Sequence, residues 1–119
     1  MITRMVMIKR KAGMSLEEFR DYYETHHATL ALRLFPMFAS YKRSYIQANP
    51  PRLPEGAAES PYDVVSEIGF ASEADHQAFL AKIARPEVVA EIRADEAKFS
   101  DLSRTFSFLT SVVVSPIKK

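Results

Sequence analysis

One histidine lies on a predicted helix face where packing alone would favour an aliphatic residue. In residues 16–34, six side chains fall within about 80° of one another at roughly 100° per residue, and so narrow a stripe normally faces a core. The six residues are Leu16, Phe19, Tyr23, His27, Leu30 and Leu34. A core-facing imidazole, with an ordinary pKa of about 6.5, either bonds a buried partner or transfers protons. Both roles are open for His27.

Two further side chains could complete a proton-transfer site. Tyr23 lies one helical turn before His27, so it is either a core aromatic or a donor to a developing enolate. Glu67 is expected on an inner strand position, where it would orient His27 or act as a second acid. Alternatively, Glu67 only pairs with Arg43 on a neighbouring strand. Dehydration or cyclisation needs a base and an acid, each contributing about 10²–10⁴-fold.

Other catalytic chemistries lack the residues they need. The chain has no cysteine, which excludes disulfides, thiolate metal sites and a cysteine nucleophile. Its histidines are residues 26, 27 and 76, and adjacent helical histidines point too far apart to chelate one metal together. The three glycines are too scattered for a phosphate-binding loop, and the sequence contains no nucleophile elbow. We therefore expect neither a metal nor another cofactor.

The composition is that of one globular domain, which we place at residues 1–119. The chain is 47% hydrophobic and 26% charged, and a domain of this length buries a core of its own. A net charge of +1 provides no broad attraction to nucleic acid. We interpret the basic run at 9–11 as the solvated end of a strand. The N-terminal apolar run is too short for a signal sequence or a membrane span, so we expect a cytoplasmic protein without a membrane partner.

Periodicity, caps and prolines predict the elements that position these residues. Ser15 and Glu18 form a capping-box pattern, so a helix should begin directly after Ser15 and end before Pro36. The other predicted elements are strands at 5–8, 38–47, 63–70 and 104–114, helices after Ser72 and at 86–99, and a proline-rich loop at 48–61. The loop is long enough to be a lid or a partner-contacting segment.

The element order predicts an α+β fold of the ferredoxin-like βαββαβ type. Such a fold has a four-stranded antiparallel sheet with helices on one face. The predicted strands are apolar on both faces, so the uncovered face needs another layer. A second copy of the chain is the simplest layer, and we therefore expect an obligate homodimer.

Three stretches resemble the EthD family, which belongs to the dimeric α/β-barrel group. They are FRDYYETHHATLALRL at 19–34, SEIGF at 66–70 and DEAKFSD at 95–101. The third is the most specific, because periodicity does not explain its acids and its phenylalanine. The resemblance covers nearly the whole chain. It implies that two sheets stack into a barrel across the dimer axis, with a pocket in each protomer between sheet and helices.

The resemblance also assigns site residues. His27 matches a recurrent histidine of the family, and Glu67 matches an acid on the facing strand. The third motif is matched by Asp95, Glu96, Phe99 and Asp101, whose acids are either structural or functional. The chain departs from the family at 35–37, where a proline–glycine turn is more usual. It also departs at Gly69, where many relatives carry a large aromatic residue, so the pocket should be enlarged or reshaped.

The family resemblance implies chemistry on aromatic polyketide-like molecules. We expect a cofactor-independent lyase or cyclase, acting by dehydration, decarboxylation or cyclisation, with a catalytic set of His27, Glu67 and Tyr23. The residues expected to contact the substrate are Tyr41, Tyr45, Phe19 and Gly69. The alternatives are a cofactor-free monooxygenase and a non-catalytic ligand-binding or accessory dimer. An open cavity containing His27 and Glu67 would favour an enzyme, whereas a cavity filled by phenylalanines 19, 79 and 106 would favour a structural role.

Overall fold

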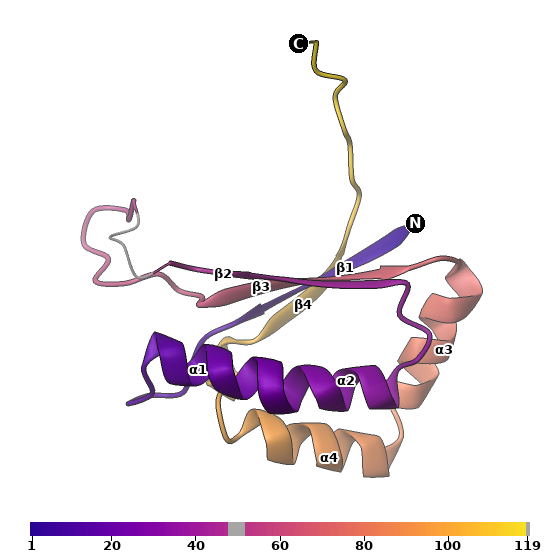
Figure 1. Cartoon of the computed structure of the whole chain (residues 1–119), viewed down its shortest axis with the longest axis horizontal. Coiled ribbons are helices and arrows are strands. Elements are labelled where there is room, and N and C mark those ends of the chain that lie inside the picture. Colours follow the sequence, from indigo (N-terminus) through magenta and orange to yellow (C-terminus); the bar gives the residue numbers. More distant parts are fainter. Residues whose placement is uncertain (48–51, 119) are drawn as a thin grey trace.

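A four-stranded antiparallel sheet carries all of the helices on one side (Figure 1). The computed structural model describes residues 1–47 and 52–118. The strands are β1 (Ile2–Ile8), β2 (Ser40–Tyr45), β3 (Val64–Phe70) and β4 (Phe106–Thr110), in the order β2-β3-β1-β4. The helical elements are α1 (Leu16–Tyr22), η1 (Tyr23–His27), α2 (Ala28–Leu34), α3 (Glu73–Ile83), α4 (Pro86–Glu96) and η2 (Leu102–Arg104). The predicted ferredoxin-like fold is confirmed.

The first helix contains a π-helical turn that periodicity did not indicate. It begins at the predicted capping box, in which Ser15 and Glu18 exchange two hydrogen bonds of 3.0 Å between side chain and backbone. It ends before Pro36, as predicted. Between α1 and α2, the five residues of η1 form the π turn. Such turns are rare and frequently lie at functional sites, and this one carries both Tyr23 and His27.

The pleat of the sheet separates a face covered by the helices from an open face. On β3, Ser66 and Ile68 are buried beneath the helices, whereas the intervening Glu67 points to the other side. On the open face, register places Met5 opposite Phe108 of β4. Phe108 is 42% exposed, and other large apolar side chains of this face are exposed with it. The part of the second face formed by β1 and β4 is therefore apolar, as predicted, whereas β3 places the charged Glu67 on it.

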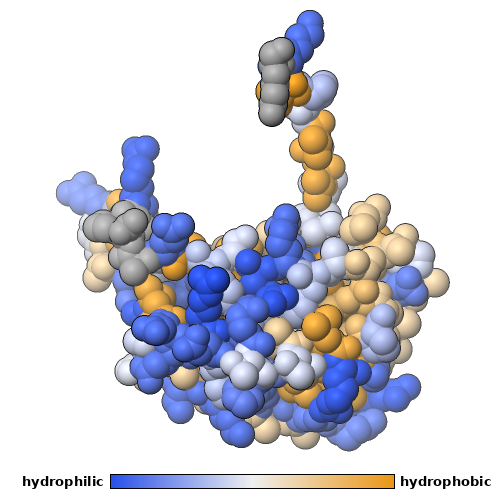
Figure 2. Space-filling model, viewed as in Figure 1, coloured by the Kyte–Doolittle hydropathy of each residue, from blue (hydrophilic) through white to orange (hydrophobic). Residues whose placement is uncertain are grey.

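Strand β4 is shorter than the predicted strand at 104–114. It pairs with β1 only as far as Thr110, which lies opposite Thr3. β1 begins at Ile2, one residue before Thr3, and the ladder between the two strands stops there. Residues 111–118 instead project from the sheet on the side opposite the helices (Figures 1 and 2). Their large apolar side chains are exposed, namely Val112, Val113, Val114 and Ile117.

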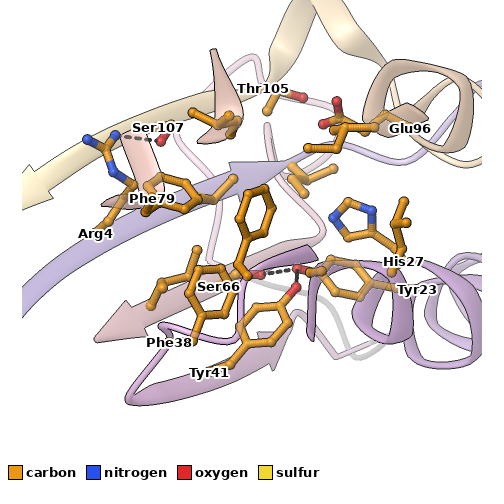
Figure 3. A pocket seen from close by; sticks show the side chains of 18 residues that line it. Arg4, Tyr23, His27, Phe38, Tyr41, Ser66, Phe79, Glu96, Thr105 and Ser107 are labelled. Atoms are coloured by element: carbon orange, nitrogen blue, oxygen red, sulfur yellow. Dashed lines mark hydrogen bonds between the residues drawn. The ribbon is translucent and has the colours of Figure 1, made fainter. Parts of the chain in front are cut away.

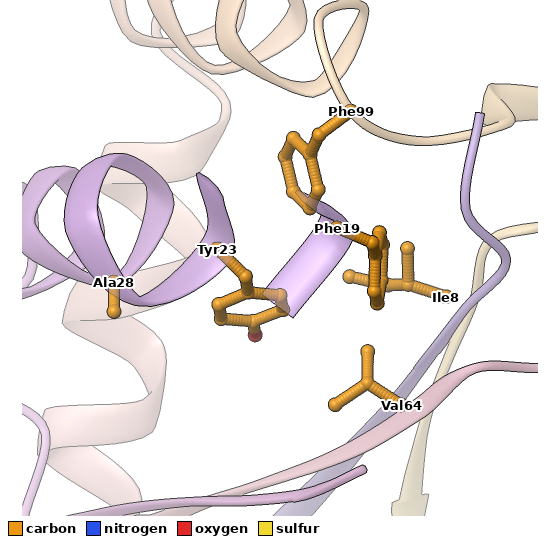
Figure 4. Packing of buried hydrophobic residues seen from close by; sticks show 6 residues of the cluster. All are labelled: Ile8, Phe19, Tyr23, Ala28, Val64 and Phe99. Carbon is orange, nitrogen blue, oxygen red and sulfur yellow. The ribbon is translucent and has the colours of Figure 1, made fainter. Parts of the chain in front are cut away.

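An aromatic cluster joins the first helix to the chain that follows α4 (Figure 4). Phe99 is fully buried at its centre. Its ring centroid lies 5.0–5.6 Å from those of Phe19, Tyr22, Tyr23 and His27. The phenylalanine of the 95–101 motif is therefore a core residue that holds the end of α4 against the π turn.

The interpretation of residues 9–11 as a solvated strand end is wrong for Lys9. It is buried, and its Nζ lies 3.4 Å from Asp63 Oδ2 and 3.3 Å from Glu59 Oε1. A buried ammonium group is stable only when it is paired, so the two carboxylates account for its position. They also join the described loop residues, 52–61, to the end of β1. Residues 48–51 of the predicted loop lie outside the described residues.

The aromatic cluster predicts a large loss of stability when Phe99 is truncated. Phe99→Ala should lower the free energy of unfolding by about 3–5 kcal/mol, because it removes a buried ring and leaves a cavity. Leu32→Ala, at a position of α2 that is 54% exposed, should change it by less than about 0.5 kcal/mol. Chemical denaturation of both variants measures the difference, and equal losses would contradict the assigned core.

Candidate functional site

An apolar pocket lies between the helices and the covered face of the sheet (Figure 3). Its volume is about 180 Å³. An apolar cavity of about 150 Å³ is known to hold benzene, so this pocket has room for one substituted aromatic ring. The polar side chains that line it are Arg4, Tyr23, His27, Tyr41, Ser66, Glu96, Thr105 and Ser107.

Asp95 is the carboxylate that orients His27. Its Oδ2 lies 2.8 Å from His27 Nδ1, and its Oδ1 accepts a 2.7 Å hydrogen bond from the Tyr22 hydroxyl. Because an ionised carboxylate can only accept, this pairing fixes the hydrogen on Nδ1 and leaves the lone pair on Nε2. His27 Nε2 has no hydrogen-bond partner among the described residues, and His27 lines the pocket.

His27 is set up as a base rather than as a permanent cation. Burial lowers the pKa of His27 below its ordinary value, while the hydrogen bond and charge of Asp95 oppose the fall. The imidazole is therefore neutral at pH 7, with Nε2 free to accept a proton. Burial, reinforced by Asp95, raises the pKa of Tyr22 to about 12, so the Tyr22 hydroxyl keeps the proton that it donates to Asp95.

Three hydroxyl groups form a hydrogen-bonded chain in the pocket wall. The Tyr23 hydroxyl lies 2.6 Å from Ser66 Oγ and 2.7 Å from the Tyr41 hydroxyl (Figure 3). Burial raises the pKa of Tyr23 and of Tyr41, so both are protonated at neutral pH. The Tyr23 ring also contacts the His27 ring edge-on, with centroids 4.9 Å apart. This row of hydroxyl groups places hydrogen-bond donors beside His27, the candidate base.

Glu96 is the carboxyl group that lines the pocket. Burial raises the pKa of Glu96, an effect that Arg93 opposes and Asp95 reinforces. A carboxyl group with a raised pKa is suited to act as a general acid. Adjacent helical residues point about 100° apart, so Asp95 reaches the first helix while Glu96 faces the cavity. The acidic motif at 95–101 was the sequence signal for both residues.

Glu67 does not enter the pocket, and the expectation that it faces His27 is wrong. Its position on β3 directs it to the open face, where its Oε2 lies 3.1 Å from Lys42 Nζ. The alternative pairing with Arg43 does not occur either, since Arg43 pairs with Glu24. The alternation along β3 was predicted correctly, but the face that the helices cover was not.

Of the predicted substrate contacts, Tyr41 lines the pocket and the others lie elsewhere. Phe19 is fully buried in the aromatic cluster. The Tyr45 hydroxyl donates a 2.5 Å hydrogen bond to Glu24, away from the cavity. Phe19 shares a helical stripe with His27, and Tyr45 shares a strand face with Tyr41, but neither Phe19 nor Tyr45 lines the cavity.

Gly69 does not enlarge the pocket, because it also points to the open face. A Cβ at this position would lie 2.3 Å from Ser40 Oγ and 2.5 Å from Met1 Sδ. The absence of a side chain therefore allows the edge of β2 and the start of the chain to approach β3. The expected effect of Gly69 on pocket size is wrong for this reason.

In residues 1–47 and 52–118, no three side chains of histidine, cysteine, aspartate or glutamate gather closely enough to hold a metal ion. Over the same residues, no helix has the length and apolar character needed to cross a lipid bilayer.

Comparison with known families identifies the chain. The model of the EthD domain matches residues 11–103, which include the π turn and the acidic motif that together form the site. The chain belongs to the EthD family. No curated protein matches the chain by sequence.

Solved structures share the fold of this EthD protein at low sequence identity. An EthD-like protein of Ralstonia eutropha JMP134 is 22% identical with a TM-score of 0.64, over 97% of this chain and 94% of that one. SnoaB of Streptomyces nogalater, a cofactor-independent oxygenase, is 16% identical with a TM-score of 0.56, over 96% and 94%. A dimeric protein of unknown function with a ferredoxin-like fold, from Bacteroides fragilis NCTC 9343, is 12% identical with a TM-score of 0.51, over 93% and 95%.

The pairing of His27 with Asp95 predicts the titration of a variant. Asp95→Asn keeps an oxygen that accepts from Nδ1 but removes the negative charge. Because Asp95 opposes the fall in the His27 pKa, that pKa should fall further in the variant. Asp101→Asn makes the same charge change away from His27 and should leave its pKa unchanged. NMR titration of the imidazole protons measures both, and a higher His27 pKa in Asp95→Asn would contradict the pairing.

Proposed function

We propose that this EthD protein is a cofactor-independent lyase or cyclase that acts on a small aromatic or polyketide-like substrate. The observation that carries the proposal is the neutral imidazole of His27, fixed by Asp95 and lining an apolar pocket. Such a group is suited to remove a proton from carbon. Glu96, with its pKa raised by burial, is suited to return a proton to oxygen.

In the proposed reaction, His27 Nε2 takes a proton from the carbon next to a substrate carbonyl. Negative charge develops on the carbonyl oxygen, where the hydroxyl of Tyr23 or Tyr41 donates a hydrogen bond. Asp95 stabilises the imidazolium that forms. Glu96 then protonates a hydroxyl on the carbon adjacent to the deprotonated one. This carbon–oxygen bond breaks, a carbon–carbon double bond forms from the enolate, and the hydroxyl leaves as water. His27 now holds one extra proton and Glu96 lacks one, so a single proton transfer through solvent restores the site.

The state of the pocket favours catalysis over a purely structural role. The cavity is open and lined by His27, although its acid is Glu96 and not the expected Glu67. Of the three phenylalanines that would fill it in a structural role, only Phe79 lines the cavity. A non-catalytic binding protein would bind ligands in the same cavity without exchanging their protons.

A cofactor-free monooxygenase is a second candidate, favoured by the likeness to SnoaB, a cofactor-independent oxygenase. The same base would convert an electron-rich substrate into its carbanion, which would reduce molecular oxygen. One oxygen atom would remain on the carbon as a carbonyl and the other would leave as water, so that a CH2 group of the substrate supplies all four electrons. An oxygen electrode separates the two candidates. Consumption of oxygen in step with turnover supports the monooxygenase, whereas unchanged turnover under nitrogen supports the lyase or cyclase.

The proton-transfer role predicts hydrogen–deuterium exchange in a simple carbon acid. Phenylacetone is a suitable probe, because its single ring suits the cavity and its benzylic protons are activated by a carbonyl. In D₂O, the native protein should accelerate exchange at the benzylic carbon, and His27→Gln should slow the catalysed exchange by about 100-fold or more. Proton NMR follows the loss of the signal.

His26→Gln is the matched control for this experiment, since His26 is the exposed neighbour of His27 in the same turn. It should leave the exchange rate unchanged. Equal rates in the native protein and a normally folded His27→Gln variant would rule out His27 as the base.

We also propose that the chain forms a homodimer through the open face of the sheet. Phe106 and Phe108 are 52% and 42% exposed there, and residues 111–118, four of which are exposed valines or isoleucine, extend on the same side (Figure 1). Soluble proteins rarely leave so much contiguous apolar surface uncovered. The structural neighbour from Bacteroides fragilis is described as dimeric. Stacking of two open faces would enclose these side chains and form a barrel.

The proposed dimer predicts that separation of the subunits is coupled to unfolding. The melting temperature should rise with protein concentration, because only the folded state associates. Phe108→Lys should weaken the association, whereas Leu32→Lys, on the exposed surface of α2, should leave it intact. Light scattering combined with thermal melting measures both effects. A stable monomer of the native protein at low concentration would contradict the proposal.

A further inference from the structure

Arg4 brings a positive charge to the pocket without a carboxylate to neutralise it. Its Nη1 donates to Ser107 Oγ at 2.9 Å, and its Nη2 lies 3.3 Å from His76 Nε2. Its Nε is buried and has no hydrogen-bond partner. Among the described residues, no acidic side chain lies within ion-pair distance of the guanidinium. Glu73 Oε1 lies 3.8 Å from Nδ1 of the neighbouring His76.

Arg4 as a whole is half-buried, but its Nε is buried and has no hydrogen-bond partner among the described residues. A buried donor without a partner costs free energy. The guanidinium is a planar fork whose donors match the two oxygens of a carboxylate. Phe79 supports this fork from the pocket wall, with the Arg4 Cζ 6.0 Å from its ring centroid. The arrangement therefore has the chemistry of a site that could bind an anion.

The position of Arg4 makes the two ends of the pocket chemically different. Arg4 and Ile8 both line the pocket from the covered face of β1, and four residues of strand span about 13 Å. Figure 3 shows Arg4 and Ser107 at one end, with His27 and Glu96 at the other. The surfaces between them are mainly apolar and include Phe38 and Phe79 of the wall.

We propose that Arg4 binds a carboxylate of the substrate, assisted by the Ser107 hydroxyl, and that the substrate is therefore a small aromatic acid. This inference rests on the proposed function and adds the class of the substrate to it. The aromatic ring would occupy the apolar middle of the pocket, with the reacting carbon directed to His27. A carboxylate held by Arg4 lies away from the base and the acid, so it serves as the anchor and is not the group that reacts.

The test compares two probes of equal shape, 4-methylbenzoate and 4-methylbenzamide, by calorimetric titration. The native protein should bind the acid at least about tenfold more tightly than the amide, as expected for a charge-assisted hydrogen-bond pair. Arg4→Met should reduce the affinity for the acid to that for the amide. The affinity for the amide should stay within about twofold of its value in the native protein. Arg33→Met, which removes an exposed arginine of α2 that pairs with Glu91, should leave the preference intact.

A second pair of variants covers the case in which Arg4→Met does not fold. Arg4→Lys keeps the charge but loses the planar fork of donors, so it should lower the affinity for the acid several-fold. Ser107→Ala should also lower the affinity for the acid without changing the affinity for the amide. Unchanged preference for the acid in both of these folded variants would overturn the inference.

The outcomes for the native protein separate this inference from the proposed function. Equal binding of acid and amide would overturn the role of Arg4 and leave the pocket as a ligand site with its proton chemistry. Failure of both probes to bind would contradict a ligand pocket, and would overturn the inference and the proposed function together.

Discussion

The hydrogen bond between His27 and Asp95 is the contact on which the site depends. It joins residues 68 positions apart, one in a π turn and one near the end of α4. The bond sets the tautomer of the imidazole, offsets part of the effect of burial on its pKa, and leaves the other nitrogen for a substrate. Each of these properties would be lost if the two helices moved apart by the length of one hydrogen bond.

Aromatic packing holds the two helices at that separation. Phe99 contacts the ring of Tyr22, directly before the π turn, and that of His27, at its end, and Tyr22 binds the second oxygen of Asp95. The carboxylate therefore has two fixed donors and little freedom to rotate. Most of the pocket is apolar, so its few polar groups act in a medium that strengthens their interactions. Stability and chemistry thus depend on the same small region of the molecule.

Much of the fold could be predicted from local patterns, because caps, prolines and strand alternation act over a few residues. The site was harder to predict. Period-two alternation separates Ser66 from Glu67 but does not say which of them the helices cover, and Glu67 was assigned to the wrong face. The acids at 95 and 96 have no periodic signature, and their roles follow only once α4 is docked. A 3.6-residue period also cannot indicate where a helix widens into a π turn.

The chain of hydroxyls formed by Tyr23, Tyr41 and Ser66 has no fixed polarity. Each oxygen can both give and accept a hydrogen bond, and rotation of three O–H bonds reverses the direction of the whole row without moving a heavy atom. The wall can therefore present a hydrogen to an oxyanion at one stage and a lone pair to a neutral hydroxyl at the next. A rigid cavity thereby adapts to successive charge states of one molecule.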